Sequence, residues 1–159
     1  MPIESHHLLT LAEELGARPD EASRRSSISR AYYAAYHRCL AWEESLPHHG
    51  DDGGLHGLHA RLIGRLLHPA ASCSTRQAKR SMALAKLLNQ QRGRRVAADY
   101  KLDEHVSQAS VRAQLDAAKA VLLHCDAHLR HVAPRTASPT TSAAHASLDA
   151  RRPSPGPTD

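Results

Sequence analysis

Apolar residues recur every three to four positions along most of this chain, a spacing typical of amphipathic helices. The stretches are separated by Gly16 and Pro19, by the turn-rich LPHHGDDGG at 46–54, by Pro69 and by Pro134. The pattern predicts five helices: residues 5–15, 21–44, 55–67, from 75 towards the basic run that ends at 101, and 104–132. The expected fold class is therefore all-α, a helical bundle.

The last 27 residues differ in composition from the rest of the chain. Residues 133–159 hold five of the nine prolines, mixed with Ser, Thr and Ala, and one large apolar residue, Leu148. Such a segment buries too little apolar surface to offset its ordering entropy. We expect a helical domain over residues 1–132 and a disordered C-terminal tail over residues 133–159.

Composition excludes several classes of protein. The chain has four Tyr, one Trp and no Phe, whereas a large β-sandwich or barrel uses many more aromatic residues. No apolar run approaches the roughly eighteen residues needed to cross a bilayer, and the N-terminus lacks the pattern of a secretion signal. Three cysteines without a Cys-x-x-Cys pair indicate reduced thiols. We expect a cytoplasmic protein without a membrane partner.

Charge is distributed unevenly along the chain, whose formal net charge is +5. Residues 61–101 hold ten Lys or Arg and one acid, Asp99, which gives this segment a net charge of +9. Residues 1–60 have a net charge of −4, with five basic and nine acidic side chains. A block this one-sided is typical either of a solvated helix face or of a surface that contacts a phosphate backbone.

The second expected helix has two distinct faces at about 100° per residue. One sector collects the candidate core residues, which are Ile28, Tyr32, Ala35, Cys39 and Trp42. Arg30, Tyr33 and His37 lie together on the opposite side. A helix with such residues on both faces is expected at the centre of a bundle or at a subunit interface.

Three motifs resemble those of the bacterial HEPN domains (higher eukaryotes and prokaryotes nucleotide-binding). SISRAYYAAYHRCLA (27–41) resembles the second-helix signature of one branch, Ser-Arg-Ala-Tyr-Tyr-Ala-x-x-His, and LLNQQRGRRVAADY (87–100) is similar to its Leu-x-x-x-Arg-x-x-Ala-Asp-Tyr. Between them, His59 followed by Leu62 and Ile63 resembles the family's His-x-x-hydrophobic entry to the third helix, although His56 aligns as well. The three motifs occur in the family's order within residues 21–132.

The resemblance implies an up-and-down bundle of four to five helices that is usually a homodimer. It also implies a function on RNA or nucleotides. Many such proteins are toxins that cut RNA and are paired with an antitoxin, often a minimal nucleotidyltransferase. The expected partners are therefore RNA, a nucleotidyltransferase-type antitoxin and a second copy of the chain.

The catalytic pattern that the resemblance brings is altered in this chain. Active HEPN nucleases share an Arg followed by a His after four to six residues, in which the Arg contacts phosphate and the His transfers a proton. Arg95 matches the Arg, but Tyr100 stands where the His is expected. With a pKa of about 10, a Tyr is a poor general base at neutral pH. We expect Arg95 to bind phosphate and Asp99 and Tyr100 to orient it.

Further side chains are candidates for the same site. We hypothesise that His37 or His59, brought near Arg95 by folding or dimerisation, replaces the missing His. The candidates for RNA binding are Arg30, Tyr33, Arg92, Arg94 and Lys101. Three functions stay open: a toxin-type RNA-acting protein, possessing or lacking endoribonuclease activity; a catalytically inactive module that binds nucleotide or a partner protein; and a scaffold for protein–protein contacts.

The histidine-rich HCDAHLRH sequence offers a metal-binding alternative. His124, His128 and His131 share one helix face, a spacing that can chelate zinc. No carboxylate completes an H-E-x-x-H pattern, and the Leu stripe of this helix lies on another face. We interpret these histidines as surface or interface residues and predict neither a metal site nor a cofactor.

Overall fold

The structure is a computed structural model that describes residues 3–132, with side chains described as far as residue 127. The predicted tail, residues 133–159, lies outside the described residues. The elements are α1 (Ser5–Gly16), α2 (Glu21–Glu44), α3 (Leu58–Leu67), α4 (Thr75–Tyr100) and α5 (Gln108–Val132). No strand occurs in the described part of the chain. The predicted all-α fold is confirmed.

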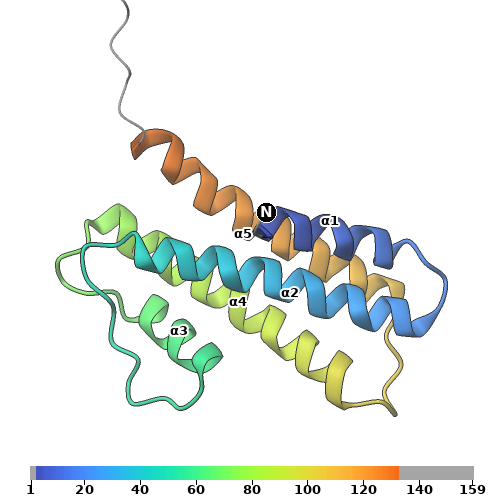
Figure 1. The fold of residues 1–159 in the computed structure, drawn as a ribbon. Helices are drawn as coiled ribbons and strands as arrows, with labels where there is room; N and C mark the ends of the chain where they lie inside the picture. The colour runs from blue at the N-terminus through green and yellow to red at the C-terminus, as the bar shows by residue number, and fades with distance from the viewer. Residues whose placement is uncertain (1–2, 133–159) are drawn as a thin grey trace, which may run out of the picture.

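The four long helices form an up-and-down bundle with α2 at its centre (Figure 1). Helix α2 contacts each of the other helices, whereas the short α3 contacts only α2 and α4. Consecutive long helices run in alternating directions (Figure 1). The short α3 therefore lies against α2 and α4, on the side of the bundle away from α1 and α5.

The core stripe predicted for α2 is confirmed. Tyr32, Ala35 and Cys39 are fully buried, and Ile28 and Trp42 are only 2% and 3% exposed. The Trp42 indole Nε1 donates a hydrogen bond to Ser81 Oγ of α4 at 3.0 Å. The small buried side chains of α2 allow the neighbouring helices to approach closely, which a central helix requires.

Helix α3 begins at Leu58, three residues later than predicted. Gly57 precedes it with a φ of +84°, a conformation that interrupts a right-handed helix. The carboxylates of Asp51 and Asp52 accept hydrogen bonds from the amides of Gly53 and Gly54, at 2.8 and 3.0 Å, and so close the turn that sequence reasoning expected here.

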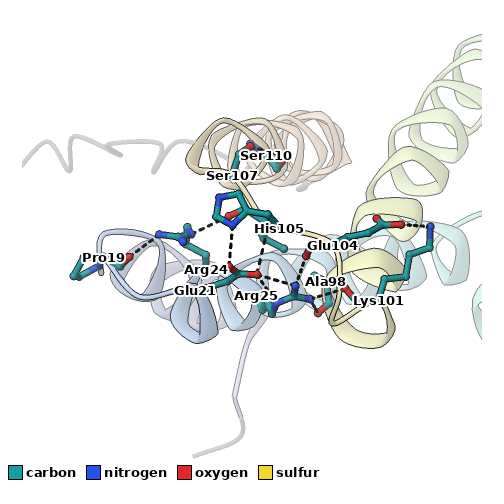
Figure 2. Close-up of polar contacts among 11 residues, drawn as sticks. Pro19, Glu21, Arg24, Arg25, Ala98, Lys101, Glu104, His105, Ser107 and Ser110 are labelled. Atoms are coloured by element: carbon teal, nitrogen blue, oxygen red, sulfur yellow. Dashed lines mark hydrogen bonds and ion pairs between the residues drawn. The ribbon is translucent and has the colours of Figure 1, made fainter.

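Helix α5 begins at Gln108 instead of residue 104, and the loop before it is hydrogen-bonded to α2 at residues 101 and 104–106 (Figure 2). The Arg25 guanidinium donates to the carbonyl oxygens of Ala98 at 2.8 Å and Lys101 at 3.2 Å, and also to that of Glu104. Its other contact is the Glu21 carboxylate, at 2.8 Å. We call this network the Arg25 latch. It ties the last turn of α4 and the start of the following loop to α2. Helix α5 itself starts where Ser107 Oγ accepts a hydrogen bond from the Ser110 amide at 3.2 Å.

Within the described residues, none of the helices combines the length and the apolar character that a membrane span requires. The expectation that the protein has no transmembrane helix agrees with this finding.

Candidate functional site

Tyr33 of α2 is the centre of a cluster of aromatic and cationic side chains. The ζ-carbons of Arg30 and Arg95 lie 5.8 and 5.6 Å from its ring centre, within the range of cation–π contacts. The His59 and His37 rings lie 5.9 and 6.4 Å from it, centre to centre. We call the whole cluster the Arg95 site; its members are Arg30, Tyr33, Tyr36, His37, His59, Arg92, Arg95, Asp99 and Tyr100.

Arg95 occupies a sheltered position on the last two turns of α4. Its Nη2 donates a hydrogen bond to Tyr33 Oη at 3.1 Å, and its Nε lies 2.7 Å from Asp99 Oδ2 in an ion pair. The Tyr100 ring centre lies 5.3 Å from its ζ-carbon. With 16% of the side chain exposed, Arg95 is held in one orientation by groups on two helices.

The charge of Arg95 is permanent. Burial lowers its pKa, but Tyr33, Asp99 and Tyr100 together outweigh burial and raise the pKa above the usual value of an arginine. Asp99 is itself held by α2, since Ser29 Oγ donates to its Oδ2 at 3.3 Å. A fixed guanidinium of this kind suits recognition of an oxyanion such as phosphate.

His59 of α3 completes the site from the opposite side. Its Nδ1 is hydrogen-bonded to Tyr32 Oη at 2.9 Å, and its ring centre lies 4.5 Å from that of Tyr36. Burial lowers the pKa of His59, and the positive charges of Arg95 and Arg92 lower it further. Both effects favour the neutral imidazole. His59 and Arg95 thus both lie against the Tyr33 ring, and replacement of the missing His by His59 stays a hypothesis.

His37 is exposed at the edge of the site. Its ring centre lies 5.3 Å from that of Tyr36, and its positive charge when protonated contributes to lowering the pKa of His59. On its far side, His37 lines a groove of about 600 Å³ whose walls also include Ile3, Leu8 and Leu122. The candidate proton-transfer side chains, His37 and His59, thus reach the site from two different helices.

Two of the candidate RNA-binding residues have contacts elsewhere. Arg94 Nη1 donates to Gln114 Oε1 of α5 at 3.5 Å, and Lys101 Nζ pairs with Glu104 Oε1 at 2.9 Å. Because successive residues of a helix point about 100° apart, the side chains of Arg94 and Arg95 diverge. The other seven predicted side chains do gather, namely Arg30, Tyr33, His37, Arg92, Arg95, Asp99 and Tyr100.

Sequence reasoning did not assign three polar neighbours to the site. Ser29 holds Asp99, Tyr32 holds His59, and the Tyr36 ring contacts the His59 ring at a tilt. Tyr32 lies on the core stripe, and nothing in a helix wheel shows that its hydroxyl reaches α3. The signal for Ser29 was present in principle, because it belongs to the motif string at 27–41.

The described residues contain no group of three or more His, Cys, Asp or Glu side chains suited to a metal ion. The alternative zinc site at His124, His128 and His131 lies partly outside the described residues, since the side chains of the last two are not described.

Comparisons of the chain with protein-family models, with curated proteins and with solved structures found no match.

Proposed function

We propose that this chain is a HEPN-type helical domain that acts on or binds RNA at the Arg95 site. The observation that carries the proposal is the fixed Arg95 guanidinium packed against Tyr33 and Tyr100, with Arg92 and Arg30 nearby. Guanidinium groups bind phosphate oxygens, and aromatic rings stack on bases. A protein that holds a nucleic-acid strand uses both the guanidinium–phosphate contact and the stacking of rings on bases.

Exposure of Tyr100 favours single-stranded RNA over a duplex. Its side chain is 69% exposed, and Arg95 lies against the ring. The exposed part of the ring offers a stacking surface to an unpaired base. Stacking of one base on an aromatic side chain contributes about 1–3 kcal/mol, whereas the bases of a duplex are already stacked on one another.

Cleavage of the bound RNA is the finer form of this proposal. Metal-independent cleavage needs a base for the 2′-hydroxyl, an acid for the leaving oxygen and a fixed cation for the charge that develops on phosphorus. Arg95 supplies the cation, and His37 and His59 are the available proton-transfer groups. In this form the protein is a toxin-type component of a toxin–antitoxin or defence module, cytoplasmic and dimeric, paired with a nucleotidyltransferase.

Salt-dependent binding tests the proposal directly. Anisotropy of a labelled single-stranded RNA is measured with the wild type, Arg95→Ala and Arg112→Ala at several salt concentrations. Arg112 is an exposed arginine of α5 outside the site and serves as the matched control. We expect Arg95→Ala to weaken binding about tenfold or more. We also expect the slope of log affinity against log salt concentration to become shallower by about 0.7.

Thermal unfolding of each variant shows whether it is folded, and Arg92→Ala provides a second test of the same face. Equal affinities of the wild type, Arg95→Ala and Arg92→Ala, or binding that does not respond to salt, would refute RNA binding at this site.

Activity is tested separately by incubating the RNA with the wild type, Arg95→Ala and His37→Ala, and by following growth after induced expression. Cleavage and growth arrest that are lost in Arg95→Ala support a nuclease toxin. Binding without cleavage by any form, and harmless expression of all, supports the catalytically inactive module that binds nucleotide or a partner protein.

A further inference from the structure

A buried phenol stands behind His59. Tyr32 is fully buried, and its hydroxyl oxygen lies 2.9 Å from His59 Nδ1. Among the described residues, this is the hydrogen bond that the Tyr32 hydroxyl makes. Burial also raises the pKa of Tyr32, so that the phenol keeps its proton at every physiological pH.

The direction of this hydrogen bond fixes the state of the histidine. If Nδ1 carried a hydrogen and donated it, the phenolic hydrogen of Tyr32 would be buried without an acceptor, which is unfavourable. If Tyr32 donates, both groups are satisfied and Nδ1 is a bare acceptor. The hydrogen of the neutral imidazole then resides on Nε2.

The surroundings of His59 oppose its protonation. The titratable or charged groups that face it are Tyr32, Tyr33, Tyr36 and His37 from α2, and Arg92 and Arg95 from α4. None of them is an acid, so an imidazolium would meet only cations and neutral phenols. His59 therefore offers the site one hydrogen-bond donor without a charge.

We propose that Tyr32 is a positioning residue that holds His59 as the neutral Nε2–H tautomer, and that His59 donates this N–H to a phosphate oxygen of the bound strand. The second half of the proposal rests on the proposed RNA function, whereas the first half does not. A histidine in this state has no lone pair on Nε2 with which to act as a general base. If the protein cleaves RNA, His37 is the side chain left for that step.

Nitrogen-15 NMR of the histidine rings tests the tautomer in the free protein. Signals of His59 are identified by their loss in His59→Gln. We expect a hydrogen on Nε2 and none on Nδ1 in the wild type at pH 7. In Tyr32→Phe, which keeps the ring and removes the hydroxyl, we expect a mixture of tautomers and a higher pKa of His59.

Two results would overturn the positioning role of Tyr32. One is a wild-type His59 that carries its hydrogen on Nδ1 or on both nitrogens at pH 7. The other is an unchanged tautomer and an unchanged pKa of His59 in Tyr32→Phe. The wild-type spectrum decides the first point even if Tyr32→Phe does not fold.

The donor role is tested with the labelled single-stranded RNA. We expect His59→Ala to bind about tenfold more weakly, and His59→Gln to restore most of that loss because its amide nitrogen reaches the position of Nε2. His59→Asn, whose shorter amide ends near the position of Nδ1, is the control and should not restore binding. Equal binding by wild type and His59→Ala would overturn the donor role. A wild type with the expected tautomer that fails to bind RNA would refute the proposed function and leave the Tyr32–His59 pairing intact.

Discussion

Replacing Arg25 by methionine is expected to lower the free energy of unfolding by about 1.5–3 kcal/mol. The methionine keeps the aliphatic packing and removes all the donors of the Arg25 latch. The carbonyl oxygen of the buried Ala98 then loses its hydrogen-bond donor. The loss of one charge-assisted hydrogen bond costs about 1.5–3 kcal/mol. Lys101 and Glu104 are exposed, so water replaces Arg25 at their carbonyls and they add little.

Urea denaturation followed by far-UV circular dichroism measures this loss, with Arg112→Met as the matched control. Arg112 is exposed on α5, and its replacement should change stability by less than about 0.5 kcal/mol. Arg25→Lys should behave like Arg25→Met, because one ammonium group cannot serve several carbonyls and the Glu21 carboxylate in the geometry of a planar guanidinium. The reasoning is refuted if Arg25→Met unfolds at the same urea concentration as Arg112→Met.

Two other predictions concern acid and loop stability. The hydrogen bond from Arg25, aided by His105, lowers the pKa of Glu21 from its ordinary 4.5 to about 2. The stabilising effect of the Glu21 carboxylate is therefore full above about pH 4.5 and is lost as the pH falls towards 2. Glu21→Gln should flatten this part of the acid-unfolding curve, and a curve identical to that of the wild type would contradict the assignment. In Gly50→Ala the new Cβ would lie 2.0 Å from the carbonyl oxygen of Arg65, so a melting temperature clearly below the wild type is expected. Gly93→Ala, with nothing within 4 Å of its Cβ inside α4, should instead gain about 0.5–1 kcal/mol, and equal shifts of the two variants would refute the packing argument.

Hydrophobic spacing predicted the helices well because each break was marked by a residue that acts locally. Asp20 illustrates this: its side chain accepts from the Ser23 amide at 2.7 Å and starts α2 at the expected residue. The start of α5 has a local signal as well, since Ser107 Oγ accepts a hydrogen bond from the Ser110 amide at 3.2 Å. The hydrogen bond from Arg25 to the Glu104 carbonyl, about 80 positions away in the sequence, is the part that the sequence pattern does not show.

The sequence shows where the basic run lies, but its net charge does not show how the fold divides it between two faces. Arg92 and Arg95 lie one turn apart and share the Arg95 site, whereas Arg94 is directed to Gln114 of α5. A helix wheel separates Arg94 from Arg92 and Arg95, but what each face contacts is known only once the neighbours of α4 are known. The run is therefore one segment in sequence and two different environments in the fold.

The tyrosine in place of the expected histidine changes what the site depends on. In the Arg-x4–6-His pattern both groups lie on one helix, whose backbone alone sets their separation. Here the histidines come from α2 and α3 and the arginine from α4, so the geometry of the site depends on how these three helices are positioned relative to one another. The close approach of Gly50 to the carbonyls of Arg65 and His68 seats the loop of residues 46–57 on α3, which carries His59. A change at Gly50 should therefore weaken RNA binding as well as stability, although Gly50 touches no member of the site.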